Sequence, residues 1–399
     1  MPNFELRFSD FGFRNSNFHI YFTKMIERFE IKVPDRAIDD LKMRLKRTRW
    51  PDEIGNSGWE YGADLSYTKE LTNYWLNTFD WRNTENEINR YPNYVADIDG
   101  VKVHFLYIKS EKKNAVPLII THGWPGSFLE MMKIIPILSH SRISFDLIIP
   151  SIPGFGFSQQ INIPGCNLWF IGELWSKLIK DLGYKKVVAQ GGDLGAGVST
   201  ALALRHSEII LGVHLNYIPG SYFPYLASDE KLSDEEDLYL KSADDWYKNE
   251  GAYMHQQRTK PLTLAFGLND SPVGLCAWIL EKYYGWSDCG GDIESVFSKD
   301  ELLSNISLYW FTETIHSSIR LYNENSKAPL HFSKNDFIKV PVGIARFHKE
   351  EPFPPRRFIE RGYNIQYWKD ISPGGHFAAM EQPALLAEEI VSFTEKIMI

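Results

Sequence analysis

The sequence predicts an α/β protein with a mostly parallel sheet, an inserted helical cap and an N-terminal extension. Several near-continuous apolar runs of strand length suit strands that are buried on both faces of a parallel sheet. These runs alternate with helical patterns, as a doubly wound sheet requires. The alternation stops from about Ile218 to Pro329, where the sequence is helical and aromatic, and a buried-strand pattern returns at residue 340. The helical insertion is therefore expected to lie as a lid over the strand ends.

The N-terminal extension contains a clear helical pattern within residues 31–53. A helix is predicted to start at Pro34, a favoured first helical position, with Ile38, Leu41 and Leu45 on one face. The opposite face is basic. A membrane-surface helix is one interpretation of such a face, and a short helix with a solvated basic face is the favoured one.

The first part of the sheet follows the extension. Residues 93–110 alternate apolar and polar side chains on both sides of Asp99-Gly100, which is a strong hairpin signal. Helical patterns separate the further strands, and the helix after the last of them is predicted to begin near Val198. The strands are predicted at 116–123, 145–154 and 187–190, and the helices between them at 129–138 and 168–183.

The insertion and the second part of the sheet complete the chain. The insertion opens with an acidic, exposed segment at 233–240. Strands are then predicted at 340–347 and 364–370, and an amphipathic helix ends the chain. We expect four segments: an extension wrapping the core and the cap (1–92), the first part of the core (93–217), the cap (218–330) and the second part of the core (331–399).

Charge and cysteine content argue against several classes of protein. The 43 basic and 51 acidic residues give a formal net charge of -8, so the chain lacks the basic footprint of a nucleic-acid-binding protein. Three cysteines without metal-ligand spacing argue against a disulfide framework or a zinc site. The N-terminus lacks an apolar signal core, and no stretch reaches about 18 uninterrupted apolar residues. We expect a cytoplasmic protein without a membrane anchor.

A glycine-flanked turn, VVAQGGDLGAG at 187–197, places Asp193 at its apex. A strand, a tight turn with small residues two before and two after the apex, and a helix form the nucleophile elbow of many hydrolases, here with aspartate in place of serine. Gly191 and Gly195 are expected where backbone packs against backbone. Taken alone, the turn is better explained by Asp193 capping the following helix. The other motifs are therefore needed to decide whether Asp193 is a helix cap or a nucleophile.

An elbow nucleophile works with a histidine and an orienting acid that follow it in the chain. His376 lies on a glycine-rich loop after the last predicted strand, and Glu350 and Glu351 follow the strand before it. Both loops leave the carboxyl ends of strands, where ligands bind in open α/β sheets. Glu350 is favoured over Glu351 because it is nearer to the strand end. His122 competes as the base, but its HGWPGS segment precedes the elbow and suits an oxyanion loop better.

An aspartate nucleophile implies chemistry at a saturated carbon. A carboxylate with an ordinary pKa of about 3.9 is ionised at neutral pH and needs no base to activate it. It can displace a leaving group and form an alkyl ester of itself, which a histidine-activated water then hydrolyses with the help of an oxyanion hole. The leaving group decides the class of enzyme, because an epoxide oxygen needs acidic donors and a halide needs indole or amide N–H groups.

Four linked motifs resemble those of microsomal-type epoxide hydrolases, which include insect juvenile-hormone enzymes and soluble fungal relatives. These motifs are HGWPGS, IPGFGFS, GGDLGAG and GGHFAAMEQP, and the likeness runs from about residue 31 to the C-terminus. The resemblance implies an α/β-hydrolase fold and hydrolysis of epoxides to vicinal diols without a metal or an organic cofactor. The expected partners are a small apolar epoxide and water.

The resemblance also implies roles for particular residues. Asp193 would be the nucleophile, His376 the base that activates water, and Glu350 the acid that orients this base. Backbone N–H groups of Trp124 and Leu194 would form the oxyanion hole, and Trp124 would also contact the substrate.

Two cap tyrosines hold the epoxide oxygen in this family. The matching segments, GAYMHQQRTKP and IRLYNENS, give Tyr253 and Tyr322. A phenol with a pKa near 10 donates strongly to a developing alkoxide and stays protonated at pH 7. From composition alone, a tyrosine that packs its ring inside the cap is the simpler explanation.

Other interpretations stay open from the sequence. A haloalkane dehalogenase shares the aspartate nucleophile, and a ligand-binding or cyclase-like protein could use the same scaffold. The aromatic residues of the cap suggest an apolar pocket but are better explained as cap core: Trp246, Trp278, Tyr283, Tyr284, Trp286 and Trp310. Membrane-bound family members begin with an apolar anchor, which this chain replaces with an aromatic, polar leader. Residues 1–30 are assigned no role. The two alternatives are that they cover the cap or that they form contacts between the subunits of a homodimer.

Overall fold

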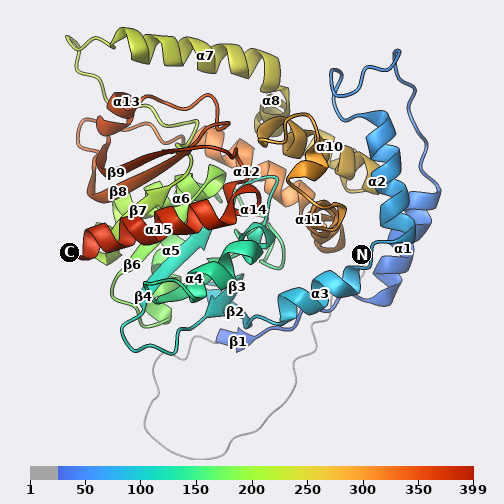
Figure 1. The fold of residues 1–399 in the computed structure, drawn as a ribbon, viewed down its shortest axis with the longest axis horizontal. Helices are drawn as coiled ribbons and strands as arrows, with labels where there is room; N and C mark the ends of the chain where they lie inside the picture. Colours follow the sequence, from blue (N-terminus) through green and yellow to red (C-terminus); the bar gives the residue numbers. More distant parts are fainter. Residues whose placement is uncertain (1–25) are drawn as a thin grey trace, which may run out of the picture.

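The sheet at the centre of the molecule contains nine strands in the computed structural model, which describes residues 26–399 (Figure 1). The strand order is β1-β2-β3-β5-β4-β6-β7-β8-β9. The pairs among β1, β2, β3 and β5 are antiparallel, and from β5 onward every neighbouring pair is parallel. The strands are β1 (Ile26–Arg28), β2 (Asn93–Ile98), β3 (Val101–Ile108), β4 (Val116–Thr121), β5 (Phe145–Pro150), β6 (Val187–Gly191), β7 (Ile210–Leu215), β8 (Ile338–Phe347) and β9 (Tyr363–Ile371).

The structure confirms the predicted hairpin and the mostly parallel sheet, and it adds two strands. Asp97 pairs with Lys102 and Ile98 with Val101 on the two sides of the Asp99-Gly100 turn. The short β1 and the central β7 were not predicted. In β7, a Cβ on Gly212 would lie 2.9 Å from the ring of Phe393, so close packing against a helix requires glycine at a position where it weakens the strand pattern.

Helices around the sheet build the core layers. Among them, α5 packs against α6, and α4 packs against α15. The helices of the sheet region are η1 (Phe128–Lys133), α4 (Ile134–Ser139), α5 (Leu168–Asp181), α6 (Asp193–Arg205), η2 (Ser207–Ile209), α13 (Arg356–Glu360), α14 (Ala378–Glu381) and α15 (Pro383–Met398).

The inserted helices all fall between β7 and β8 in the chain. They are α7 (Asp234–Glu250), α8 (Ala252–Thr259), α9 (Pro261–Leu268), α10 (Pro272–Trp286), η3 (Ile293–Ser295), α11 (Lys299–Thr312) and α12 (Ile315–Lys327). Of these, α8, α10 and α11 group on one side of the sheet, next to α2 (Leu65–Asn77) of the N-terminal extension (Figure 1). The acidic segment starts α7 as expected, since Ser233 and Glu236 form a capping box at its N-terminus. We refer to α7–α12 as the cap.

The extension contributes α1 (Asp35–Lys46), α2 (Leu65–Asn77) and α3 (Trp81–Asn89), which contact cap helices α10 and α11. Leu41 and Leu45 of α1 are buried, as the pattern predicted, but Pro34 is the N-cap residue rather than the first helical residue. Residues 1–25 lie outside the described part, so the expectations for the leader are not tested. The four-segment division of the chain stays a prediction.

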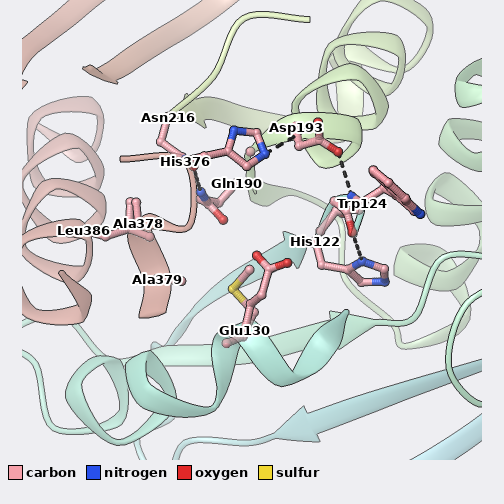
Figure 2. A pocket seen from close by; sticks show the side chains of 14 residues that line it. His122, Trp124, Glu130, Gln190, Asp193, Asn216, His376, Ala378, Ala379 and Leu386 are labelled. Atoms are coloured by element: carbon pink, nitrogen blue, oxygen red, sulfur yellow. Dashed lines mark hydrogen bonds and ion pairs between the residues drawn. The ribbon is translucent and has the colours of Figure 1, made fainter. Parts of the chain in front are cut away.

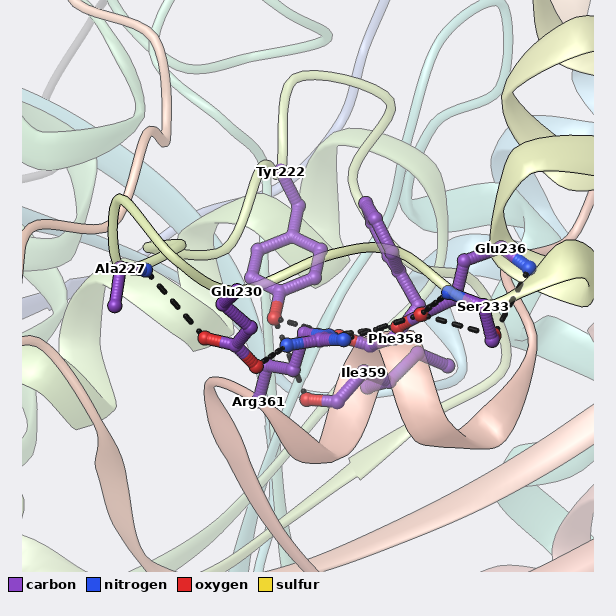
Figure 3. Close-up of polar contacts among 8 residues, drawn as sticks. All are labelled: Tyr222, Ala227, Glu230, Ser233, Glu236, Phe358, Ile359 and Arg361. Carbon is purple, nitrogen blue, oxygen red and sulfur yellow. Dashed lines mark hydrogen bonds and ion pairs between the residues drawn. The ribbon is translucent and has the colours of Figure 1, made fainter.

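A cluster of polar contacts ties the start of the cap to the second part of the core (Figure 3). The Arg361 guanidinium Nε donates to Glu236 Oε1 at 2.6 Å, and the same guanidinium pairs with Glu230. The Tyr222 hydroxyl donates to the backbone carbonyl of Phe358 at 3.1 Å. The hydrogen bonds from Arg361 lower the pKa of Glu236 to about 2, against the opposing effect of burial. Glu236 and Arg361 therefore both stay charged at strongly acidic pH.

Among residues 26–399, no helix is both long and apolar enough to cross a bilayer. Burial is instead concentrated in one continuous core, which runs from the sheet into the cap and the extension. Because cap and core share this apolar interior, the cap is packed onto the strand ends rather than tethered loosely to them.

Candidate active site

Four loops meet at the carboxyl edge of the parallel strands. They follow β4, β6, β8 and β9 and carry Trp124, Asp193, Glu350 and His376, respectively. Neighbouring parallel strands end at the same edge, so residues far apart in the chain converge there. Figure 2 shows that Trp124, Asp193 and His376 lie close together around a small pocket.

The elbow is as tight as its glycines predict. A Cβ on Gly195 would lie 1.9 Å from the carbonyl oxygen of Thr121, and one on Gly191 would lie 2.3 Å from the carbonyl oxygen of Gly195. Asp193 itself has a φ of 46°, in the left-handed region that costs energy for residues other than glycine. The predicted helix start near Val198 is wrong: α6 begins at Asp193, because the chain turns directly from the strand into the helix.

The Asp193 carboxylate is held by another loop. Its Oδ1 accepts a hydrogen bond from the backbone N–H of Trp124 at 2.7 Å, and the backbone N–H of Leu194 also donates to the carboxylate. Gly192, not Asp193, is the N-cap residue of α6, so the helix-capping interpretation is wrong. Burial raises the pKa of Asp193, while the charge of His376 and the two N–H groups oppose this.

His376 joins Asp193 and Glu350. Its Nδ1 lies 2.9 Å from Glu350 Oε2, and its Nε2 lies 3.7 Å from Asp193 Oδ2. Burial alone would lower the pKa of His376, but the neighbouring carboxylates, Glu350 first, outweigh burial and raise it to about 9. A carboxylate on Nδ1 fixes the tautomer that points Nε2 toward Asp193.

The two competing candidates occupy different places. The Glu351 side chain is 58% exposed and pairs with Arg346, whereas that of Glu350 is 7% exposed. His122 is buried with both ring nitrogens occupied, because Nδ1 contacts the carbonyl of Gly123 and Nε2 accepts the N–H of Ile152. Burial lowers the pKa of His122 to about 4. His122 therefore braces the loop and is not the histidine beside Asp193.

Both tyrosines of the cap lie over this site. Tyr253 in α8 stacks on Trp124 with ring centroids 5.4 Å apart, and Tyr322 in α12 meets the same indole edge-on at 5.7 Å. The centroids of the two phenol rings are 6.1 Å apart. Burial first, and then nearby charges that include Asp193, raise the pKa of both tyrosines well above the ordinary value. Both phenols therefore keep their protons at neutral pH.

Glu130, a partly buried acid beside the site, was not predicted from the sequence. Glu130 and Asp193 line a cavity of about 20 Å³ that also contacts His376 and Gln190 (Figure 2). Burial raises the pKa of Glu130 to about 8. A Cβ on Gly126 would lie 1.1 Å from the Glu130 carboxylate. The sequence feature that corresponds to this contact is a glycine, Gly126, directly after the HGWP segment and a glutamate, Glu130, four residues later.

Trp286 was assigned to the cap core but belongs to the site. Its ring centroid lies 5.0 Å from that of His376 and 5.2 Å from that of Tyr253. The end of α10 is also bonded to the histidine loop, because the backbone N–H of His376 donates to the carbonyl of Trp286 at 3.0 Å. Asp288 and Glu381 add further bonds between these segments: Asp288 N–H donates to Glu381 Oε2 at 2.8 Å, and the N–H of Gly374 donates to Asp288 Oδ2 at 3.0 Å.

An α/β hydrolase with an aspartate at its elbow is the class that the fold and these loops define. Residues 26–131 match a family model described as "Epoxide hydrolase N terminus", and residues 116–273 match one described as "alpha/beta hydrolase fold". The chain is 36% identical over 405 residues to Epoxide hydrolase 1 of Sus scrofa, covering 92% of this chain and 88% of that protein. The chain therefore belongs to the epoxide hydrolase family.

Further comparisons agree with this family. The chain is 34% identical over 401 residues to Juvenile hormone epoxide hydrolase 1 of Ctenocephalides felis, covering 93% of this chain and 86% of that protein. The solved structure of Aspergillus niger epoxide hydrolase superposes with a TM-score of 0.82 at 30% identity, covering 94% of this chain and 97% of that chain. The resemblance carried by the four motifs is thereby confirmed.

Proposed function

We propose that the chain converts a small apolar epoxide to a vicinal diol through a covalent ester on Asp193. The observation that carries this proposal is the convergence of three groups. One oxygen of Asp193 is bonded to a backbone N–H, the other faces His376, and the two tyrosines of the cap lie above the neighbouring indole. This arrangement offers a nucleophile, a base and two acids to a molecule that needs all of them.

In the first half-reaction, an Asp193 oxygen attacks an epoxide carbon and the carbon–oxygen bond of the ring breaks. The electron pair of that bond moves to the epoxide oxygen, where negative charge develops. Tyr253 and Tyr322 donate hydrogen bonds to this oxygen and one of them delivers a proton. The product is an ester of Asp193 that carries a β-hydroxyl group. The aromatic neighbours Trp124 and Trp286 favour an apolar substrate.

In the second half-reaction, His376 removes a proton from water, and the resulting hydroxide attacks the ester carbonyl carbon. Negative charge moves to the carbonyl oxygen, which Trp124 and Leu194 stabilise through their backbone N–H groups. The tetrahedral intermediate then expels the diol oxygen, which takes its proton from His376. Asp193 is left as a carboxylic acid; it gives up its proton and the phenolate formed in the first half-reaction regains one, so both groups return to their starting states. Glu350 holds the imidazole and stabilises its protonated form.

The small cavity under the site suits the water of this second step. Its volume of about 20 Å³ exceeds the 10–15 Å³ or so that one water needs. Gln190 Oε1 is buried there without a hydrogen-bond partner among the described residues. An unpaired acceptor of a residue that lines a polar cavity is suited to accept a hydrogen bond from water. We therefore assign Glu130 and Gln190 to holding the water next to His376.

A single turnover in H₂¹⁸O with enzyme in excess tests the covalent step. The oxygen that enters the first diol should come from Asp193, so this diol should carry no label, and the label should appear in the protein. The measurement is mass spectrometry of the diol and of the peptide that contains residue 193. Labelled diol in the first turnover would refute the ester.

The dehalogenase alternative has one structural observation in its favour. The indole Nε1 of Trp124 is buried in the site and has no partner within the described part of the chain. Chlorinated and brominated alkanes should nevertheless release no halide, because two phenols suit an oxygen leaving group. Halide release that survives the double change Tyr253→Phe and Tyr322→Phe would favour the alternative. The homodimer and the cytoplasmic location stay predictions.

A further inference from the structure

A buried ammonium lies against the ring of Tyr253. Lys282 is in α10, its side chain is 5% exposed, and its Nζ lies 4.5 Å from the centroid of the Tyr253 ring. The same Nζ lies 5.7 Å from the centroid of Trp286. Lysine is rarely buried unless its charge is compensated. An ammonium held this deep over an active-site phenol therefore requires an explanation.

The position suits a cation–π contact. An ammonium within about 6 Å of a ring centroid is attracted to the ring, and the contact strengthens when water is excluded. The ring of Tyr253 is already aligned with Trp124, at an interplanar angle of 6°. With an indole and an ammonium packed on it, the ring has little freedom to turn, so the direction of its hydroxyl is fixed.

The charge has a second effect. When the hydroxyl of Tyr253 donates its proton to the epoxide oxygen, negative charge gathers on the phenol and spreads into its ring. A cation over that ring stabilises the charge that develops, more than it stabilises the neutral phenol. Such an interaction grows in the transition state and therefore speeds ring opening.

Glu281 supplies the opposing charge. Its carboxylate pairs with the Lys282 ammonium and is 27% exposed. Burial and Asp193 are the larger causes that raise the pKa of Tyr253, and Glu281 adds to them. Without Lys282, the carboxylate of Glu281 would act on the phenol uncompensated.

We propose that Lys282 is a positioning residue for ring opening, which orients the phenol of Tyr253 and stabilises the negative charge it acquires. The inference rests on the proposed function, because it assigns Tyr253 as a donor to the epoxide oxygen. Lys282 touches neither substrate nor nucleophile in this scheme and acts through the ring alone. Its effect is confined to the first half-reaction.

The test measures ester formation and ester hydrolysis separately, by rapid-quench single turnovers of styrene oxide. Lys282→Met, which keeps the length and removes the charge, should slow ester formation by about 3-fold to 30-fold, the range expected for a buried cation–π contact. Lys282→Arg should restore most of the rate, since the cation is kept. Ester hydrolysis should not change in either variant.

A matched control lies elsewhere in the protein. Lys299 places its Nζ 5.9 Å from the centroid of Tyr74 and is 18% exposed, and neither residue belongs to the four loops or lines the cavity beside Asp193. Lys299→Met should leave both half-reactions unchanged. An equal slowing by Lys299→Met would show that loss of any such lysine disturbs the enzyme, and the inference would fall.

Double variants test whether Lys282 acts through Tyr253. In a Tyr253→Phe background, Lys282→Met should slow ester formation no further, whereas in a Tyr322→Phe background it should keep its full effect. If Lys282→Met slowed ester formation equally in both backgrounds, or did not slow it in the wild-type background, the role of Lys282 would be overturned. The proposed function would not be affected by that result, provided that the wild-type protein still turns over the epoxide. Failure of the wild-type protein to form an ester with any epoxide would instead overturn the proposed function.

A second substitution guards against a misfolded variant. Glu281→Gln removes the opposing carboxylate and leaves the ammonium in place, so ester formation should be as fast as in the wild type or faster. A slower reaction in Glu281→Gln, with its melting temperature unchanged, would contradict the inference even if Lys282→Met does not fold.

Discussion

The charge of Asp193 should hold the proton on His376. Nε2 of His376 lies 3.7 Å from Oδ2 of Asp193. A pair of charges at this distance interacts by about 1 kcal/mol in water and by about 4 kcal/mol at an effective dielectric constant of about 20. Because one pKa unit is about 1.4 kcal/mol, Asp193→Asn should lower the pKa of His376 from about 9 to between about 6 and 8.

NMR titration of ring-labelled histidines measures this change, with His376→Gln used to assign the resonance. Glu351→Gln is the control, because it removes an exposed carboxylate from the loop that carries Glu350. This control variant should leave the pKa of His376 unchanged. An unchanged pKa of His376 in Asp193→Asn would refute the reasoning.

The same reasoning predicts the pH dependence of the second half-reaction. Forming the ester neutralises Asp193, so the pKa of His376 falls when the ester forms. A base must be neutral, and the neutral fraction of a histidine rises with pH. The rate of ester hydrolysis should therefore increase with pH and level off between about pH 6 and 8. A profile that still rises through pH 9 would show that the ester does not lower this pKa.

Three further predictions concern the two tyrosine donors, the glycine of the elbow and the ion pair at the start of the cap. Tyr253→Phe and Tyr322→Phe should each slow ester formation by about 10-fold to 100-fold in single turnovers, because each removes one hydrogen-bond donor to the alkoxide. If neither variant changed the rate, the two tyrosines would not be donors to the epoxide oxygen. Gly195→Ala should lower the melting temperature and abolish activity, since its Cβ would lie 1.9 Å from the carbonyl oxygen of Thr121 at the end of β4; a fully stable variant would contradict the packing. Arg361→Met should destabilise the protein by about 3 kcal/mol in urea unfolding, because the charge of the buried Glu236 would lose the ion-pair partner Arg361. Arg361→Met with Glu236→Gln should recover part of that loss.

The strands that carry the site were predictable because their patterns are local. Apolar runs ending in glycine or proline marked β4 and β5, a returning buried-strand pattern marked β8, and the hairpin turn marked β2 and β3. The strand β7 escaped because its Gly212 is required by a contact with Phe393, which lies far along the chain. A pattern within one segment does not reveal a neighbour that arrives from the end of the chain.

The candidate site shows the same limit. Order and spacing brought Asp193, Glu350 and His376 forward as candidates, because each follows a predicted strand. The tyrosines were chosen only through the resemblance, since 20 tyrosines cannot be ranked by composition. Glu130 and Trp286 were missed because their importance comes from packing across loops and cap, which no sequence period records.

The bonds between the end of α10 and the histidine loop have a consequence for protein engineering. The carbonyl of Trp286 accepts the N–H of His376, and Asp288 is bonded to the same loop. A cap grafted from a relative to change substrate preference would bring a foreign partner to the catalytic base. Chimaeras should work best when residues 286–288 and residues 374–381 are transplanted together, because hydrogen bonds join the two segments.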